Sequence, residues 1–145
     1  MKFADFHAGQ VITLGPVSIT EREIVDFARA YDPQPFHTDP EVAAGSRWGG
    51  LIASGWHTCA VAMRLACDHL LAGSESIGSP GVAYIKWPAP LRPNQALTLR
   101  VEVLETRRSE RRPELGILRW RWHLRQGDGR DVLELEATSL FEVGA

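Results

Sequence analysis

The chain has 145 residues, of which 44% are hydrophobic and 23% charged, and its formal net charge is -2. This length and composition are typical of one globular cytoplasmic domain with a sizeable core, and they exclude a disordered or collagen-like chain. The small net charge gives no electrostatic reason to expect nucleic acid as a partner. We predict a single domain over residues 1–145, located in the cytoplasm.

No stretch predicts export or a membrane span. The N-terminus lacks the apolar run of a signal peptide, and the longest apolar-rich stretch, Trp56 to Leu71, contains Arg64 and Asp68. The two cysteines, Cys59 and Cys67, would lie about 12 Å apart on one helix, too far for a disulfide bridge. We expect buried free thiols, and no metal-ligand spacing around them predicts a zinc site.

The first part of the chain predicts one irregular strand and one helix. Residues Gln10 to Ile19 contain a β-branched run and a Gly-Pro break, as in a short strand. Thr20 and Glu23 have the spacing of a capping box, so we expect a helix to begin there. Its apolar period ends where Asp32 precedes a proline, which places Asp32 at the helix end.

The segment YDPQPFHTDP follows this helix and contains three prolines. Prolines remove backbone donors and fix φ, so we expect the segment to be stiff and extended, able to aim the side chains of Asp32 and His37. Asp39 precedes a further proline and fits the N-cap of a short helix around Glu41 to Ala44. We therefore interpret Asp39 as a cap rather than as a second reactive carboxylate.

The longest predicted helix runs from about Trp56 to Leu71. It follows a glycine-rich turn that ends at Gly55, and it is apolar on most sides. A helix of this kind should be buried, with the rest of the chain wrapped around it.

The pattern then changes from helical to alternating and predicts a sheet. The four expected strands are Gly81 to Trp87, Ala96 to Leu104, Leu115 to Arg125 and Val132 to Phe141. Together with the helix they predict an α+β fold with one core.

A Gly-Asp-Gly turn joins the last two strands and suggests a register for them. In this register Trp122 lies opposite Leu135. Two charge pairs accompany it, Arg121 opposite Glu136 and His123 opposite Glu134. We interpret the outward basic residues Arg119, Arg121, His123 and Arg125 as a solvated face with cross-strand charge pairs, and contact with an anionic ligand is the alternative.

The run FARAYDPQPFHTDPEVAAGSRWGGLIASGWHT resembles the motif region of MaoC-like dehydratases, which include the (R)-specific enoyl-CoA hydratases. The family pattern is approximately Asp-x-Asn-Pro-aliphatic-His, followed by a glycine at the head of the central helix. Further along, KWPAPLRPNQALTLRVEV is similar to the family's strand-turn-strand segment. The pattern falls here on Asp32, Gln34, Pro35, Phe36, His37 and Gly55.

The resemblance implies a hot-dog fold, in which a curved antiparallel sheet wraps around a long central helix and short helices precede that helix in an overhanging segment. It also implies a homodimer or higher homo-oligomer that acts on an acyl thioester of coenzyme A or of a carrier protein. Asp32 and His37 would be the catalytic residues, and Gly55 the oxyanion donor. No metal and no redox cofactor would be needed, and coenzyme A would enter only with the substrate.

These residue types suit the hydration of a double bond conjugated to a thioester. That reaction needs a base for water, an acid for the α carbon and a donor for the enolate oxygen. Asp32 and His37 can hold one water between them, and their pKa values respond to burial and to each other. Gly55 can offer a backbone amide at a helix start. The spacing does not fix which of the pair is the base.

Structural interpretations of the same residues remain open. Asp32 could have no role beyond ending its helix or forming an Asx turn, and His37 could be a half-buried structural ring. His57 lies two residues after Gly55, where a histidine without an evident partner is more often structural. The residues that we expect around a pocket are Gln34, Phe36, Trp48, Leu51, Trp56 and Met63.

Three positions depart from the family pattern. Gln34 stands where many members have asparagine, and Phe36 where an aliphatic residue is common. Met63 stands eight positions after the glycine, where the hydratases carry a small hydroxyl residue near the catalytic pair. These departures bear on the identity of the substrate.

The sequence therefore predicts an enoyl-thioester hydratase or dehydratase. A non-catalytic acyl-CoA binding module or partner subunit is the alternative, and an acyl-CoA thioesterase is a third. Acyl chain length, the carrier and the physiological direction are left open by these patterns.

Overall fold

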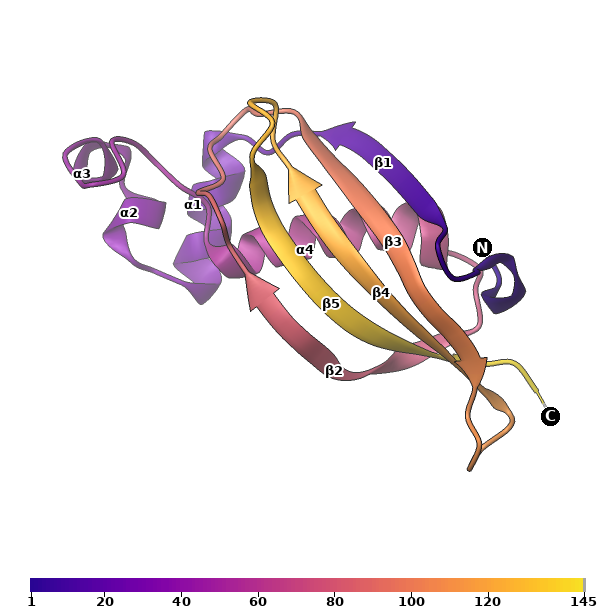
Figure 1. Ribbon diagram of the computed structural model, residues 1–145. Coiled ribbons are helices and arrows are strands. Elements are labelled where there is room, and N and C mark those ends of the chain that lie inside the picture. The colour runs from indigo at the N-terminus through magenta and orange to yellow at the C-terminus, as the bar shows by residue number, and fades with distance from the viewer. Residues whose placement is uncertain (145) are drawn as a thin grey trace.

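The computed structural model describes residues 1–144 and contains a five-stranded antiparallel sheet with a central helix (Figure 1). The strands lie in the order β1-β3-β4-β5-β2. The helical elements are η1 (Phe3–Asp5), α1 (Glu21–Tyr31), α2 (Pro35–Thr38), α3 (Pro40–Ala44), α4 (Gly55–Ala66) and η2 (Cys67–Leu71). The strands are β1 (Val11–Val17), β2 (Ser76–Lys86), β3 (Leu97–Arg108), β4 (Leu115–Arg125) and β5 (Asp131–Glu142).

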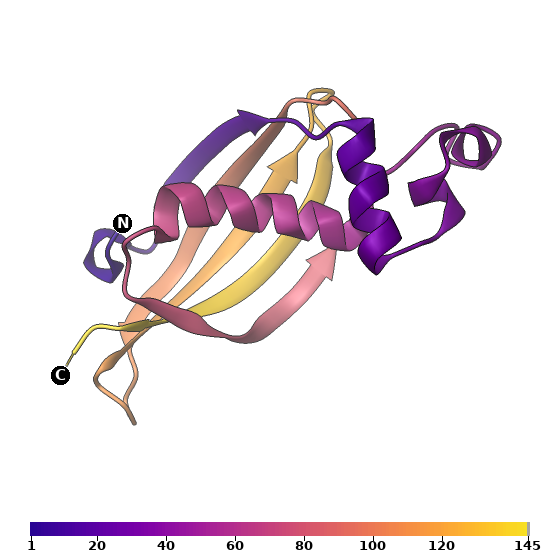
Figure 2. The ribbon, with the colours of Figure 1, turned by 180° about the vertical axis from the view of Figure 1, so that it is seen from behind.

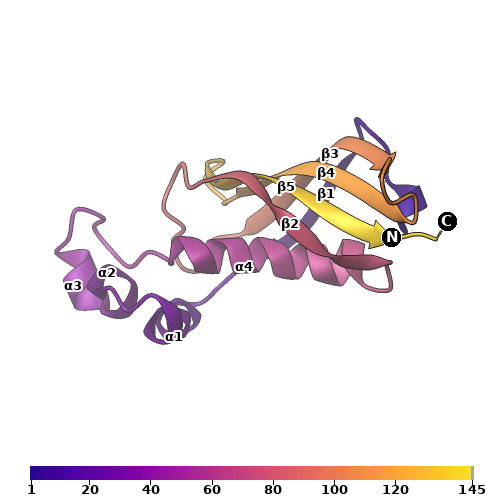
Figure 3. The same ribbon diagram turned by 90° about the horizontal axis from the view of Figure 1, so that it is seen from below.

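The sheet curves around α4, which lies across its concave face (Figure 2). Helices α1, α2 and α3 project beyond one end of the sheet, next to the start of α4 (Figure 3). This is the arrangement that the sequence predicts, with short helices in the overhang. Within residues 1–144, no helix is long and apolar enough to cross a membrane.

Strand β4 shows how the sheet forms its core. Leu118, Trp120, Trp122 and Leu124 face α4 and are buried, in strict alternation with half-buried or exposed polar residues. This period of two is the geometry of a strand with one apolar face. The predicted register is confirmed, because Trp122 lies opposite Leu135 in β5.

The outer face of the sheet carries charge pairs. The predicted partners Arg121 and Glu136 lie opposite each other, with Arg121 Nη2 at 3.5 Å from Glu136 Oε1. His123 lies opposite Glu134, and its Nδ1 is 3.2 Å from Asp131 Oδ2. Pairs of this kind at the surface contribute at most about 1 kcal/mol each. Because the basic side chains are already paired, the geometry favours the solvated-face interpretation.

The central helix is less buried and less regular than predicted. Its last turn, η2, is π-helical, so the stretch from Trp56 to Leu71 is not one uniform α-helix. Trp56 is 58% exposed and Met63 43%, although both line a cavity between α4 and the sheet, so the sheet does not close over this part of the helix. Cys59 and Cys67 are free thiols as expected, but they are half-buried rather than buried.

The segment between α1 and α3 is not extended, which corrects the expectation from its prolines. Residues Pro35–Thr38 form the single helical turn α2, closed by a hydrogen bond of 2.9 Å from the Asp39 amide to the Pro35 carbonyl. Proline at the first position of a helix loses no hydrogen bond, so it can begin a turn as readily as prevent one. Asp39 caps α3, as predicted, by accepting from the amides of Glu41 and Val42.

Helix α1 packs on the first turn of α4 through an aromatic pair. The rings of Phe27 and His57 are stacked, with centroids 4.4 Å apart and an interplanar angle of 8°. His57 is buried, and its Nδ1 has no hydrogen-bond partner within residues 1–144. Burial lowers the pKa of His57 below its usual value, although the nearby Glu23 acts in the opposite direction. This burial and stacking agree with the structural role that the sequence favours for His57.

We predict that His57 makes the fold sensitive to acid. The folded state disfavours the charged ring, so the unfolded state binds more protons once the pH falls below about 6.5, and the free energy of unfolding decreases from there. Urea unfolding measures the free energy of unfolding at pH 7.5 and at pH 5.5. The decrease between these two pH values should be smaller for His57→Phe, which retains the aromatic stack, than for the parent. The exposed His69 provides the control, since His69→Gln should keep the full loss. An equal loss in the parent and in His57→Phe would contradict this role.

Candidate functional site

The fold brings Asp32 and His37 together. Asp32 is the C-cap residue of α1 and His37 lies on α2, and His37 Nε2 is 3.3 Å from Asp32 Oδ2. The side chains are 7% exposed for His37 and 17% for Asp32. The pair is therefore largely withdrawn from bulk water but accessible from one side.

A backbone carbonyl fixes the orientation of the His37 ring. Nδ1 lies 2.7 Å from the carbonyl oxygen of Ile52. A carbonyl can only accept, so we assign the Nδ1 proton to this bond. In the neutral ring Nε2 is then an acceptor, and it faces Asp32.

Asp32 remains a carboxylate at neutral pH. Burial acts to raise its pKa, but hydrogen bonds from Gln34 and Ser54, with a smaller contribution from the His37 ring when that ring is protonated, outweigh burial and hold the pKa below its usual value. Gln34 Nε2 donates to Asp32 Oδ1 at 2.7 Å. Two acceptor atoms thus face each other across 3.3 Å, and they can be satisfied by one shared proton or by a water that donates to both.

Gly55 is the first residue of α4 and lines the same cavity as Asp32 and His37, with a volume of about 390 Å³. Ser54 caps this helix by accepting from the Trp56 amide at 3.3 Å. Within residues 1–144 the Gly55 amide donates to no protein group. A free amide at a helix start is a suitable donor for a developing oxyanion.

The absence of a side chain at Gly55 has a packing reason that the sequence does not reveal. A Cβ at this position would lie 2.6 Å from Cε2 of Trp87. Trp87 follows β2, and its Nε1 donates to the Gly55 carbonyl at 3.0 Å. The indole therefore packs on the backbone at the start of α4.

The other residues predicted around the pocket occupy different places. Trp48 and Trp56 line the cavity of Asp32 and His37. Gln34 contacts the pair through Asp32, and Phe36 packs edge-on against the His37 ring, with centroids 4.4 Å apart. Leu51 is buried in the core and does not line this cavity.

Hydroxyl groups near the pair come from positions that the sequence analysis missed. Met63 lines a second cavity and lies outside that of the pair. Ser54 and Thr58 are both buried, Thr58 lines the cavity of the pair, and its Oγ1 donates to the Ser54 carbonyl at 3.2 Å. The signal for Ser54 was its position directly before Gly55, where a serine caps a helix. Among residues 1–144, no group of three potential ligands could hold a metal ion.

Comparisons with known proteins agree with this architecture. The sequence matches the family described as MaoC like domain over residues 3–117. It is 34% identical over 118 residues to the uncharacterized protein YdeM of Bacillus subtilis (strain 168), covering 81% of this chain and 82% of that protein.

Solved structures give the same result. A MaoC-like dehydratase from Rhodospirillum rubrum superposes with a TM-score of 0.86 at 34% identity, over 96% of this chain and 94% of that one. The (R)-hydratase PhaJ1 from Pseudomonas aeruginosa shares the fold, with a TM-score of 0.73 at 22% identity over 96% and 84% of the two chains. The predicted hot-dog fold is confirmed.

We predict that Gly55→Ala displaces the indole of Trp87 and breaks its hydrogen bond to the Gly55 carbonyl. The free energy of unfolding should decrease by about 1 kcal/mol, the typical contribution of one such bond. In a Trp87→Ala background the same substitution should change the free energy of unfolding little. Urea unfolding of the parent, the two single variants and the double variant measures this coupling. Gly45→Ala is the control, because no atom lies closer than 3.8 Å to its added Cβ. Equal costs in the two backgrounds would contradict the proposed contact.

Proposed function

Because this chain belongs to the family of MaoC-like domains, we propose that it adds water reversibly to a 2-enoyl-CoA, giving the (R)-3-hydroxyacyl-CoA or a related hydroxyacyl thioester. Family membership and the likeness to (R)-hydratases support hydratase or dehydratase activity in general. The finer proposal rests on one observation, the convergence of Asp32, His37 and the free Gly55 amide on a single cavity.

In the proposed reaction the pair positions one water against C3 of the substrate. The water oxygen bonds to C3 while the pair takes the proton that water loses. The π electrons move to the thioester oxygen, where the Gly55 amide binds the enolate. The enolate then collapses as the pair gives one proton to C2. One water is consumed, and the protonation state of Asp32 and His37 is restored.

The proton belongs to the pair rather than to one residue. Nε2 of His37 and Oδ2 of Asp32 are close enough to share it, so a pH–rate profile would report apparent pKa values of the two together. Buried acid–base groups of this kind contribute about 10² to 10⁴ in rate. The proposed reaction takes place in the cytoplasm and needs no metal and no redox cofactor, and coenzyme A or a carrier protein enters only as part of the substrate.

We predict that Asp32→Asn and His37→Ala each reduce kcat/KM for crotonyl-CoA by at least about 100-fold, because each removes one half of the acid–base pair. The loss of enoyl absorbance measures the hydration. Asp39→Asn is the matched control, since Asp39 is a carboxylate in the same segment that caps α3, and activity should be retained.

The same assay separates the alternative functions. Release of free thiol from crotonyl-CoA, with the double bond intact, would identify a thioesterase. A parent protein that binds acyl-CoA without turnover, and whose Asp32→Asn and His37→Ala variants bind equally well, would be a binding module or a partner subunit. Either result would contradict the proposed hydration.

We also propose that two copies pair through the β2 edge of the sheet. Within residues 1–144 strand β2 pairs only with β5, so its other edge has unpaired backbone groups there. Ile77 on β2 is 55% exposed, and it is not among the residues of β2 that line the cavity between α4 and the sheet. Apolar side chains beside an open strand edge are typical of a protein–protein contact.

We predict that Ile77→Glu shifts the protein from dimer to monomer in sedimentation velocity, because a buried carboxylate at that edge would be unpaired. Val11→Glu is the matched control. Val11 is 49% exposed on β1, the opposite edge of the sheet, and its substitution should leave the dimer intact. A monomeric parent, or an Ile77→Glu variant with the mass of the parent dimer, would contradict this interface.

A further inference from the structure

Two cavities meet at Trp56. The cavity that contains Asp32 and His37 has a volume of about 390 Å³, and a second one of about 490 Å³ lies between α4 and the concave face of the sheet. Among the described residues, Trp56 is the only one that lines both. The reaction site and the second cavity are therefore neighbours with one side chain between them.

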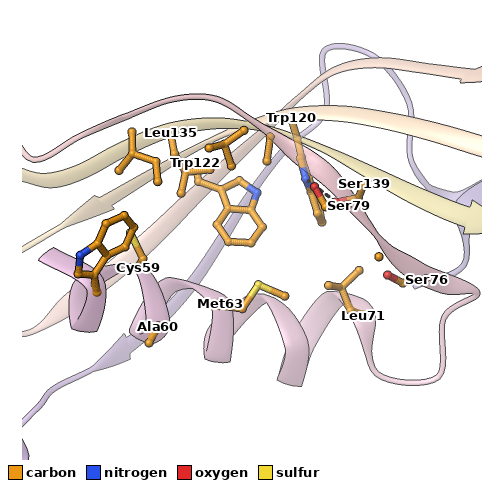
Figure 4. A pocket seen from close by; sticks show the side chains of 15 residues that line it. Cys59, Ala60, Met63, Leu71, Ser76, Ser79, Trp120, Trp122, Leu135 and Ser139 are labelled. Atoms are coloured by element: carbon orange, nitrogen blue, oxygen red, sulfur yellow. Dashed lines mark hydrogen bonds between the residues drawn. The ribbon is translucent and has the colours of Figure 1, made fainter. Parts of the chain in front are cut away.

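The second cavity is apolar. Figure 4 shows Cys59 and Met63 of α4 on one side of it and Trp122 and Leu135 of the sheet on the other. No Asp, Glu, Lys, Arg or His side chain lines it, and its serine hydroxyls are those of Ser76 near Leu71 and of Ser79 and Ser139 beside Trp120. A lining of this composition suits an aliphatic chain.

The cavity follows α4 away from the reaction site. Trp56, Met63 and Leu71 line it in succession along the helix, and the seven helical steps from Trp56 to Met63 alone span about 10 Å. An acyl chain bound with its thioester at Gly55 would therefore meet Trp56 first and then have room beyond it.

The Trp56 indole is less restrained than that of its neighbour Trp87. Trp87 packs edge-on against Trp56, with ring centroids 5.5 Å apart, and is held by its hydrogen bond to the Gly55 carbonyl. Within residues 1–144 the Trp56 indole nitrogen has no hydrogen-bond partner, and the side chain is more than half exposed. Exposed side chains change rotamer within nanoseconds.

We propose that Trp56 separates the reaction site from an acyl-chain cavity and sets the length of chain that the protein accepts. Short chains end before the indole, and longer chains displace it and enter the space along α4. This assignment rests on the proposed function insofar as the ligand is an acyl thioester.

Binding of saturated acyl-CoA tests the assignment without turnover. We expect Trp56→Ala to raise the affinity for octanoyl-CoA relative to butanoyl-CoA by about tenfold in calorimetric titration, with a smaller gain for Trp56→Phe. One methylene placed in an apolar pocket is typically worth a factor of about ten or more, so a tenfold change is a modest expectation for a chain that is longer by several methylenes. Val42→Ala, an exposed position that lines neither cavity, should leave the ratio unchanged.

A second substitution locates the chain. Ala137 on β5 lines the second cavity only, so Ala137→Phe should fill it and cancel the gain of Trp56→Ala while butanoyl-CoA still binds. Binding of butanoyl-CoA also reports that each variant is folded. If Trp56→Ala leaves the ratio unchanged, or if Ala137→Phe leaves the gain intact, the assignment is wrong; a second copy filling this cavity would give the first of these results.

The two proposals fail separately. If octanoyl-CoA binding follows the expected pattern but the parent does not hydrate crotonyl-CoA, the cavity assignment stands and the proposed reaction falls. If crotonyl-CoA is hydrated and Trp56→Ala does not change the affinity for octanoyl-CoA relative to butanoyl-CoA, the proposed reaction stands and the cavity assignment is wrong. With an active parent, kcat/KM for trans-2-octenoyl-CoA relative to crotonyl-CoA should rise in Trp56→Ala by a similar factor.

Discussion

The hydrogen bond from His37 Nδ1 to the Ile52 carbonyl organises the candidate site. It connects the single turn of α2 to the segment that enters α4, across 15 positions of the chain. It orients the ring, assigns the proton to Nδ1 and directs Nε2 at Asp32. The same segment leads within three residues to Gly55, so one bond sets the position of the pair relative to the free amide.

The start of α4 satisfies several constraints in a few residues. Ser54 caps the helix and helps to hold Asp32 ionised, and Gly55 offers its free amide. His57 packs against Phe27 of α1. Trp87 follows the end of β2, and its indole packs on the Gly55 backbone. This contact leaves no room for a side chain at Gly55. The curvature of the sheet around α4 is what brings the end of β2 to this point.

The position of Met63 illustrates how a site can change while its fold is retained. On α4 this residue lines the apolar cavity and not the cavity of Asp32 and His37. Buried hydroxyls reach the neighbourhood of the pair from Ser54 and Thr58 instead. The departure from the family pattern at Met63 thus lies in the apolar cavity beside that of Asp32 and His37, and not among the polar groups around the pair.

Local patterns in the sequence determined the caps at Thr20 and Asp39, the alternation of β4 and the register that sets Trp122 opposite Leu135, because each depends on neighbouring residues or on one short turn. The spacing of Asp32 and His37 pointed to the site by family resemblance. Only the tertiary structure decided what lies around them: the turn of α2, the Ile52 carbonyl, Trp87 over Gly55 and the cavity beyond Trp56. These depend on where the wrapped sheet places segments far apart in the chain, and no local pattern encodes that distance.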